Sequence, residues 1–332
     1  MSESWNRRRV HTSDDFGGID LEVIEAGPDD GPVVVLAHGF PESSHSWRHQ
    51  IDPLAAAGYR VLVPDQRGYG FSSAPRDVAA YRSDHLAGDL VALLDDVGAD
   101  DALFVGHDWG ALLVWDLVRY HPDRVRGVVN VSVPYTPWPA APTELFRATY
   151  GDRFFYMLYF QEVGPPEAEF DPAIRESMRR WIWVGSAEGY RQPGAIEDGV
   201  PAEGNGFFDS VTAHGPIPDG IPPWLTDADL ERYTQQFEQS GFFGPVSWYR
   251  NLDADWELTK DLPAPSVPVA FIGGDKDMVI AHRMEYVDSM QLSLPDYRGA
   301  TIIADAGHWT QQEKPAEFNE ALLAALDTVT PD

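Results

Sequence analysis

The sequence predicts an α/β protein, in which a mostly parallel, doubly wound sheet is interrupted by an inserted helical segment. Three observations lead to this class. Apolar runs alternate with helical periodicity between residues 20 and 134, and the same alternation returns after residue 260. The stretch between them is rich in Pro, Gly and aromatic residues and has few strand signals. We therefore expect a core made of 1–134 and 261–332, with a helical cap (lid) at 135–260.

The first part of the core contains five predicted strands and two predicted helices. The run VVVLA at 33–37 is unbroken and apolar, as in strands that are buried on both faces of a parallel sheet. Apolar residues recur at helical spacing over 86–97, and Gly98 can end that helix. A second helix over 109–120 ends before Pro122. The other strands are expected at 21–26, 60–64, 102–105 and 125–133.

Fewer elements can be assigned in the cap. Thr226 is a predicted N-cap with acidic residues in the first turn after it, and it opens a helix that reaches about Gln239. The stretch 189–223 is rich in Gly and Pro, so we expect a loop there. After the cap, strands are expected at 267–272 and 301–304, and helices at 282–290 and 316–326.

The composition excludes several classes of protein. The sequence contains 24 Lys and Arg residues and 53 Asp and Glu residues, so its formal net charge is −29. Such a charge repels nucleic acids and anionic membranes. The absence of cysteine excludes disulfides, Cys-zinc sites and thiol nucleophiles. No apolar run approaches the roughly 20 residues that cross a bilayer. The arginines at 7–9 lack the apolar segment of a secretion signal. We expect a soluble, cytoplasmic protein.

The clearest functional motif is Gly-His-Asp-Trp-Gly at 106–110. It lies between a predicted buried strand and an amphipathic helix. A tight turn at this place requires glycine on both sides of the central residue, which then projects above the sheet. The motif therefore predicts a nucleophile elbow with Asp108 as the nucleophile. The simpler alternative is an ordinary Asp near a helix start, where the helix dipole favours a carboxylate.

A catalytic triad also requires an acid and then a histidine later in the chain. Both are present after predicted strands, at the sheet edge where catalytic residues of open α/β sheets gather. Asp277 follows the strand at 267–272, and His308 follows the strand at 301–304. Asp275 is the alternative acid.

The turn His-Gly-Phe-Pro at 38–41 follows the strand at 33–37 and is a candidate oxyanion hole. Its donor would be the amide of Phe40, because Pro41 has no N–H. The amide of Trp109 would be the second donor. The alternative is a plain turn without a catalytic role.

An aspartate nucleophile narrows the chemistry. A carboxylate is already ionised at pH 7, but it is a poor nucleophile toward acyl carbons and suits displacement at an sp3 carbon that carries a strained oxygen or a halide. The product is an alkyl ester on Asp108, and His308 would then activate water to hydrolyse it. This favours an enzyme that opens epoxides or removes halides over an esterase.

Together these motifs resemble those of the epoxide hydrolases of the α/β-hydrolase superfamily, including the hydrolase domain of the soluble vertebrate enzyme. The matching segments are 38–41, 67–73, 106–110, 156–162, 248–251, Asp277 and 307–310, so the resemblance runs over nearly the whole chain. It implies an α/β-hydrolase fold with a helical cap, and the conversion of an apolar epoxide and water to a vicinal diol without a cofactor.

The resemblance also implies two cap tyrosines that hold and protonate the epoxide oxygen. These are Tyr156 and Tyr249, and Tyr159 competes with the first of them. A phenol with a pKa of about 10 stays protonated at pH 7 and can donate to the alkoxide. We expect the substrate pocket to include His38, Pro41, Phe155 and Trp309.

No metal is expected, because His45 and His49 have helical ligand spacing but no third ligand near them. The expected partners are the epoxide and water, and a homodimer is left open. Two alternatives to the leading interpretation stand. A haloalkane dehalogenase would use the same Asp108, Asp277 and His308 with Trp109 and a cap tryptophan on the halide. A binding protein with a disabled site would lack a triad member, and none is missing.

Overall fold

The computed structural model describes residues 5–190, 200–213, 215–281 and 283–330. Within these ranges an eight-stranded sheet runs in the order β1-β2-β4-β3-β5-β6-β7-β8. β2 pairs antiparallel with β1 and β4, and the remaining neighbours pair parallel, so the predicted α/β class is confirmed. The strands are β1 (Asn6–His11), β2 (Asp20–Ala26), β3 (Val33–Ala37), β4 (Arg60–Pro64), β5 (Ala102–His107), β6 (Val125–Val131), β7 (Val269–Gly274) and β8 (Tyr297–Ile303).

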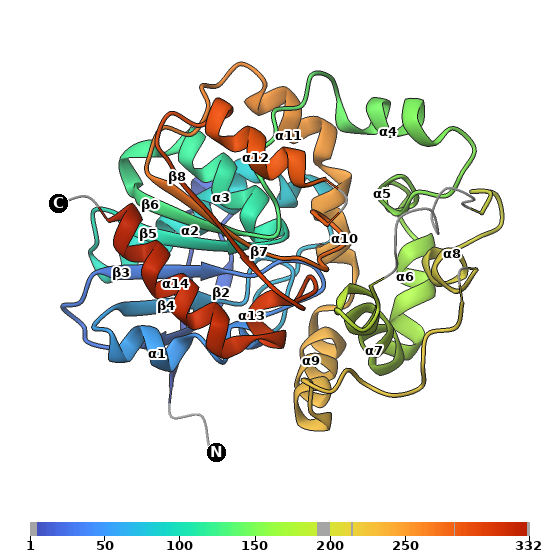
Figure 1. Ribbon diagram of the computed structural model, residues 1–332, viewed down its shortest axis with the longest axis horizontal. Coiled ribbons are helices and arrows are strands. Elements are labelled where there is room, and N and C mark those ends of the chain that lie inside the picture. Colours follow the sequence, from blue (N-terminus) through green and yellow to red (C-terminus); the bar gives the residue numbers. More distant parts are fainter. Residues whose placement is uncertain (1–4, 191–199, 214, 282, 331–332) are drawn as a thin grey trace.

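Helices cover both faces of the sheet, and a second group follows β6 (Figure 1). The helices on the sheet are α1 (Ile51–Ala56), α2 (Ser83–Val97), α3 (Trp109–Tyr120), α12 (Met284–Ser293), α13 (Thr310–Glu313) and α14 (Pro315–Val329). The inserted helices are α4 (Pro142–Tyr150), α5 (Tyr156–Tyr159), α6 (Pro165–Phe170), α7 (Ile174–Gly185), α8 (Phe207–Thr212), α9 (Asp227–Ser240), α10 (Phe243–Arg250) and α11 (Leu252–Thr259).

The central strands are buried on both faces because successive side chains point to opposite sides. Val34 packs with α1 and α14, whereas Val35 packs with α2 and α3 on the other face. The five residues of β3 are all buried, which explains why this strand is an unbroken apolar run. The apolar cluster on the side of α2 and α3, to which Val35 belongs, continues into the inserted helices. The two parts of the chain therefore share this part of the core.

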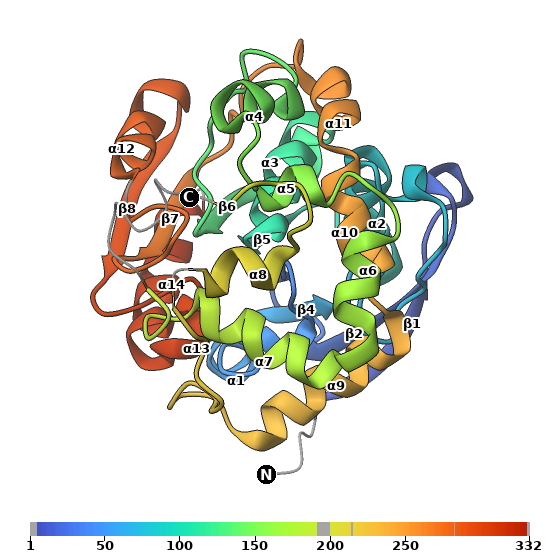
Figure 2. The same ribbon diagram turned by 90° about the vertical axis from the view of Figure 1, so that its right-hand side faces the viewer.

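The inserted helices lie beyond one end of the sheet (Figure 1), and the turned view places α7 and α8 in front of it (Figure 2). This end carries the carboxyl ends of the parallel strands, since Trp109, two residues after the end of β5, has its ring 4.8 Å from that of Tyr249 in α10. Among the described residues, no helix combines the length and apolar character needed to cross a membrane.

Most predicted elements are present where expected. β3, β4 and α3 have the predicted bounds, and α2 ends at Gly98 in the left-handed conformation with φ 70°. β8 starts four residues before the predicted 301–304, because this edge strand is largely exposed and its first half carries no apolar run. The helix expected over 282–290 spans Met284–Ser293, and His282 lies outside the described residues.

The fold departs from the sequence analysis in two places: one strand was not predicted, and one expected loop is wrong. β1 was not anticipated, because it is an edge strand with three arginines and only Val10 is buried in it. The stretch 189–223 is not all loop, since α8 forms within it; its residues 191–199 and 214 lie outside the described residues. α8 exists because Phe207 and Phe208 are buried, and Phe207 stacks on Trp181 with ring centroids 3.6 Å apart.

Two leucine-to-alanine substitutions test the position of the core. Leu326 of α14 is fully buried against the sheet, so Leu326→Ala should lower the free energy of unfolding by about 3–5 kcal/mol. Leu292 of α12 is 86% exposed, and the same substitution there should change it by less than about 0.5 kcal/mol. Urea unfolding measures both, and equal losses would contradict this packing.

Candidate active site

Asp108 occupies a strained turn between β5 and α3. Its φ of 53° and ψ of −118° are unusual for a residue with a side chain. The glycines on either side are required by their surroundings: a Cβ at Gly106 would lie 2.5 Å from the Gly110 carbonyl oxygen, and a Cβ at Gly110 would overlap the Ala37 carbonyl oxygen. The side chain of Asp108 is therefore held at the end of the sheet, as the elbow motif predicts.

The turn after β3 reaches the same carboxylate. The backbone N–H of Phe40 donates to Asp108 Oδ1 at 2.7 Å. Gly39 permits this approach, because a Cβ there would lie 2.5 Å from the same oxygen. The predicted oxyanion donor thus already binds one oxygen of the predicted nucleophile.

His308 lies between two carboxylates. Its Nδ1 is 3.0 Å from Asp277 Oδ1, and its Nε2 is 3.4 Å from Asp108 Oδ2. Burial disfavours the charged ring, but Asp277 and Asp108 outweigh this effect and hold the pKa of His308 well above its ordinary value. Asp277 is fully buried, whereas Asp275 is exposed, so the geometry selects Asp277 as the partner of His308.

The two predicted tyrosines lie together above Asp108. The ring centroids of Tyr156 and Tyr249 are 5.8 Å apart, and Tyr249 lies edge-on to Phe40 at 5.2 Å. Burial raises the pKa of each phenol, and the Asp108 carboxylate raises both further. Both phenols are therefore protonated at neutral pH.

Tyr159 is placed differently. Burial raises the pKa of its phenol, and the carboxylate of Glu169 raises it further. For Tyr156 the carboxylate that raises the phenol pKa is that of Asp108. The ring of Tyr159 packs on Phe154 and Phe160, with centroids 5.4 and 6.0 Å away. This arrangement favours Tyr156 over Tyr159 as the tyrosine near Asp108.

The four predicted pocket residues lie at different depths. His38 is fully buried: its Nε2 accepts the N–H of Gln66 at 3.0 Å, and its Nδ1 lies 3.0 Å from the Gly39 carbonyl oxygen. Pro41 is buried beside it in the same turn. The other two lie closer to the inserted helices, with Trp309 4.8 Å from the His308 ring and Phe155 stacked on Tyr150 at 4.0 Å.

A buried ion pair beneath the site was not anticipated. His107 Nδ1 lies 2.6 Å from Glu42 Oε2, and His107 Nε2 is 2.8 Å from the His308 carbonyl oxygen. Glu42 also accepts the N–H of Gly39 at 3.1 Å. The pair thus connects the turn after β3 to the backbone of His308. The sequence signal was limited to position: Glu42 directly follows the turn at 38–41, and His107 lies inside the elbow motif at 106–110.

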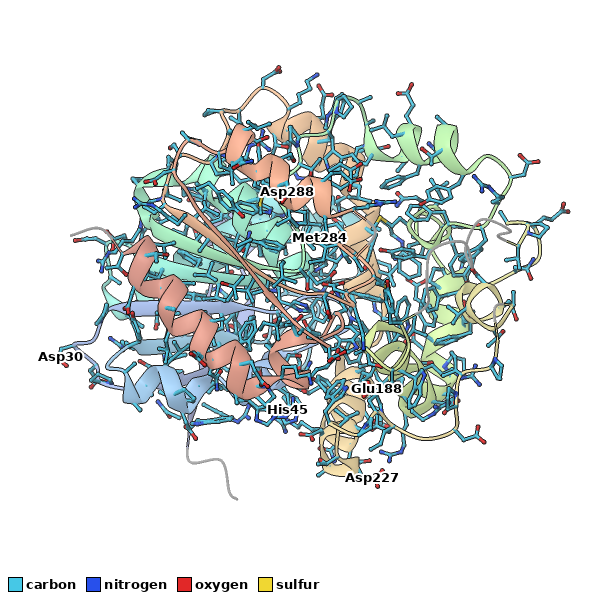
Figure 3. All side chains as sticks on the ribbon, viewed as in Figure 1. Asp30, His45, Glu188, Asp227, Met284 and Asp288 are labelled. Carbon is cyan, nitrogen blue, oxygen red and sulfur yellow. The ribbon has the colours of Figure 1, made fainter. Side chains whose placement is uncertain are left out.

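The two histidines considered as metal ligands do not form a metal site. His45, labelled in Figure 3, instead lies 2.8 Å from Asp229 of α9. Burial lowers the pKa of His49 to about 4. Among the described residues, no group of three or more His, Asp or Glu side chains is placed to hold a metal ion.

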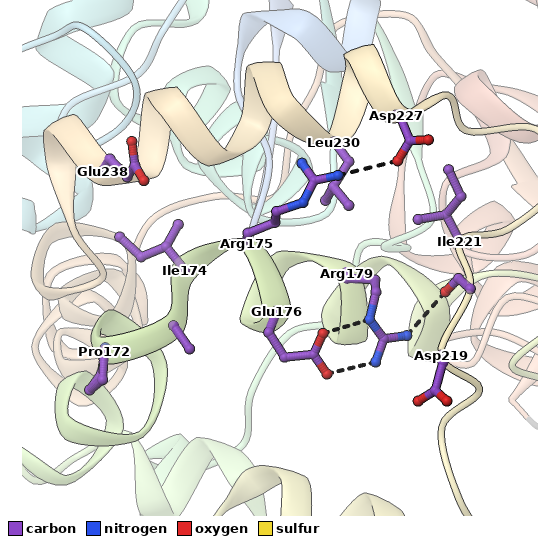
Figure 4. Close-up of a pocket in the computed structure, with 12 residues that line it drawn as sticks. Pro172, Ile174, Arg175, Glu176, Arg179, Asp219, Ile221, Asp227, Leu230 and Glu238 are labelled. Carbon is purple, nitrogen blue, oxygen red and sulfur yellow. Dashed lines mark hydrogen bonds and ion pairs between the residues drawn. The ribbon is translucent and has the colours of Figure 1, made fainter.

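A groove of about 690 Å³ lies between α7 and α9, away from these residues (Figure 4). Its cations are paired with acids: Arg175 lies 3.2 Å from Asp227, and Arg179 lies 2.7 Å from Glu176. None of the described residues that line it belongs to the candidate site. The groove is therefore separate from the candidate site around Asp108.

The Glu42–His107 pair generates a stability prediction. Burial opposes ionisation of Glu42, but the charge and hydrogen bond of His107 outweigh it and lower the pKa of this carboxyl from 4.5 to about 2. Its contribution is therefore present above about pH 4.5 and is lost as the pH falls toward 2. Glu42→Gln should lower the free energy of unfolding at pH 7 by about 3 kcal/mol.

Urea unfolding of both forms at pH 7 and pH 4 measures this effect, which should be smaller at pH 4. The exposed Glu320→Gln is the matched control and should stay within about 0.5 kcal/mol of the parent. Equal stability of Glu42→Gln and the parent at pH 7 would refute the prediction.

The chain is similar to several known proteins. Residues 32–162 match the alpha/beta hydrolase fold family. Epoxide hydrolase A of Mycobacterium tuberculosis is 46% identical over 319 residues, which cover 94% of this chain and 95% of that protein. Bifunctional epoxide hydrolase 2 of Sus scrofa is 35% identical over 320 residues, 94% of this chain but 54% of that one.

Solved structures agree with these relatives. The crystal structure of epoxide hydrolase A from Mycobacterium thermoresistibile superposes with a TM-score of 0.89 at 42% identity, covering 99% of this chain and 100% of that one. An epoxide hydrolase from an endophytic Streptomyces gives a TM-score of 0.89 at 37% identity, covering 98% and 96%. The expected resemblance is confirmed, and the chain belongs to the epoxide hydrolases of the alpha/beta hydrolase fold.

Proposed function

We propose that this epoxide hydrolase converts an apolar epoxide to a vicinal diol through an ester between a substrate carbon and Asp108. One observation carries the proposal: a carboxylate, and not a hydroxyl, occupies the turn between β5 and α3, with His308 3.4 Å from one of its oxygens. A carboxylate can displace oxygen from a strained sp3 carbon at neutral pH without first losing a proton.

The two oxygens of Asp108 have different roles in ring opening. Oδ1 accepts the Phe40 N–H, so Oδ2 is the oxygen that attacks the epoxide carbon. As the new C–O bond forms, the ring C–O bond breaks and its electron pair stays on the epoxide oxygen. Tyr156 or Tyr249 donates a proton to this oxygen, since the raised pKa of each phenol keeps it protonated until then.

Ester hydrolysis uses the other groups. His308 takes a proton from water as the water oxygen attacks Asp108 Cγ, and negative charge develops on Oδ1, where the amides of Phe40 and Trp109 stabilise it. The Cγ–Oδ2 bond then breaks, and Oδ2 leaves with the substrate carbon as the second hydroxyl of the diol, protonated by His308. The other proton of the water returns the tyrosine to its phenol form, so Asp108 is again a carboxylate with one oxygen from water. Esterification also removes the Asp108 charge, one of the two charges that raise the pKa of His308. The first step therefore lowers the pKa of the base that the second step needs.

The rings around the site favour an apolar aryl or alkyl epoxide. Phe40 lies edge-on to Trp181 with ring centroids 5.0 Å apart, and to Phe160 at 5.7 Å. A wall of this kind binds apolar groups and excludes water from the ester.

We also propose that residues 135–260 form the cap, and that 1–134 and 261–332 form the catalytic core. Both tyrosines come from the inserted segment, whereas Asp108, Asp277 and His308 come from the core. In this division the cap binds the epoxide oxygen and the core carries the ester. No observation favours the dehalogenase alternative.

Turnover of matched epoxides and haloalkanes tests the function. Aryl and alkyl epoxides should give diols, and chloro- and bromoalkanes of the same size should release no halide. Product identity is measured by chromatography and halide by ion analysis. Halide release with intact epoxides would overturn the proposal.

Two substitutions test the covalent mechanism. Asp108→Asn should abolish turnover without loss of fold, because the amide cannot form the ester. His308→Gln should still be alkylated but should not hydrolyse the ester, so its mass should increase by one substrate. Intact-protein mass spectrometry measures the adduct, and absence of an adduct would mean that His308 does not serve hydrolysis.

The tyrosines are tested by removing each hydroxyl. Tyr156→Phe and Tyr249→Phe should each slow ring opening by about 10- to 100-fold, and the double substitution should slow it further. Tyr159→Phe removes the same hydroxyl from the other end of α5 and should have little effect on ring opening. Rapid quench measures the rate at which each variant is alkylated by the epoxide. A double variant that is alkylated as fast as the parent would exclude acid catalysis by these phenols.

A further inference from the structure

Glu313 is a buried carboxyl group that the proposed mechanism leaves without a role, and burial raises its pKa from 4.5 to about 7. It is the last residue of α13, and it accepts three backbone N–H groups. Its Oε2 binds the N–H of Gly307 at 2.9 Å and that of Ala187 at 3.0 Å, and its Oε1 binds the N–H of Trp309 at 3.1 Å. Two of these donors flank His308, and the third belongs to the inserted segment just after α7.

Further contacts join the same two segments. The backbone N–H of His308 donates to the Gly185 carbonyl at 2.8 Å, and the indole N–H of Trp309 donates to the Ile182 carbonyl at 2.7 Å. A Cβ at Gly185 would lie 2.7 Å from the Trp309 ring, and a Cβ at Gly307 would overlap the Ala187 nitrogen. Glu188, labelled in Figure 3, marks this junction of cap and core.

The loop that carries His308 needs such anchors. β8 ends at Ile303, so His308 lies beyond the ladder of the sheet. Its ring must nevertheless be placed between Asp277 and Asp108, at 3.0 and 3.4 Å. A misplacement of about 1 Å can reduce a rate by about 100-fold.

We propose that Glu313 is a positioning residue for ester hydrolysis, whose carboxylate fixes the His308 loop to the end of α7. This inference rests on the proposed alkyl-enzyme mechanism. Ring opening does not depend on Glu313 in the same way. The nucleophile for ring opening, Asp108, is held by the β5–α3 turn. The two segments that carry the tyrosines are joined by another contact, in which the Gln161 amide donates to the Tyr249 carbonyl at 2.9 Å.

Glu313→Gln is the informative substitution because it preserves size. An amide has one acceptor oxygen, so its NH2 group would face at least one backbone N–H that the carboxylate now accepts. Gln should therefore loosen the loop at one end without opening a cavity. Glu317→Gln, four residues on and exposed in α14, removes the same charge and is the matched control.

The experiment is a single-turnover reaction of the full chain with an aryl epoxide, followed by rapid quench and intact-protein mass spectrometry. In Glu313→Gln, ester hydrolysis should slow by about 10- to 100-fold, while alkylation stays within about threefold, so the alkyl-enzyme accumulates. Glu317→Gln should match the parent in both steps. Parent-like hydrolysis in Glu313→Gln, or equal slowing of both steps, would overturn the proposal.

A second variant covers the case in which Glu313→Gln does not fold. Ala187→Pro removes one of the three N–H donors and keeps the carboxylate; Ser186 before it has ψ 162°, which a following proline tolerates. Slowed hydrolysis with preserved alkylation is again expected, and unchanged hydrolysis would count against the proposal. If the parent and His308→Gln form no alkyl-enzyme, the covalent mechanism has failed, which is a separate result.

Discussion

The rest of the structure depends on the close approach of three chain segments around Asp108. A residue with a side chain at φ 53° costs about 1–3 kcal/mol, and it persists only where its surroundings allow no relaxation. Here β5 is fully buried between β3 and β6, and glycines at 39, 106 and 110 let backbone and carboxylate come within contact distance. The strained turn thus fixes the carboxylate in one position, relative to which the other groups are arranged.

The ionisable side chains around this position form two groups that contact each other. Above the sheet edge, His308 lies between Asp277 and Asp108; below it, His107 binds Glu42. Because His107 also contacts the His308 carbonyl oxygen, the lower pair helps to hold the upper one in place. A buried carboxylate left without its histidine would be costly, so the stability of the fold and the geometry of the candidate site depend on the same contacts.

Much of this arrangement could be predicted from the sequence, because the signals were local. Apolar runs and helical periodicity located β3, β4 and α3, and the elbow motif identified Asp108. The misses have physical reasons. β1 is an exposed edge strand without an apolar run, and α8 depends on its contact with Trp181. The roles of Glu42 and Glu313 arise from partners 65 and 126 residues away, which no local pattern records.

The two halves of the proposed reaction are supplied by different parts of the chain. The groups that open the epoxide approach Asp108 from the inserted helices, whereas the groups that hydrolyse the ester come from loops at the end of the sheet. The rings of Phe40 and Tyr249, 5.2 Å apart, lie where the two parts meet. Since hydrolysis acts on the Asp108 ester whatever alkyl group it carries, changes in the inserted helices can alter which epoxide enters without rebuilding the hydrolytic groups. Substrate choice and ester hydrolysis are therefore separable in this architecture, provided that the contacts holding α7 to the His308 loop are kept.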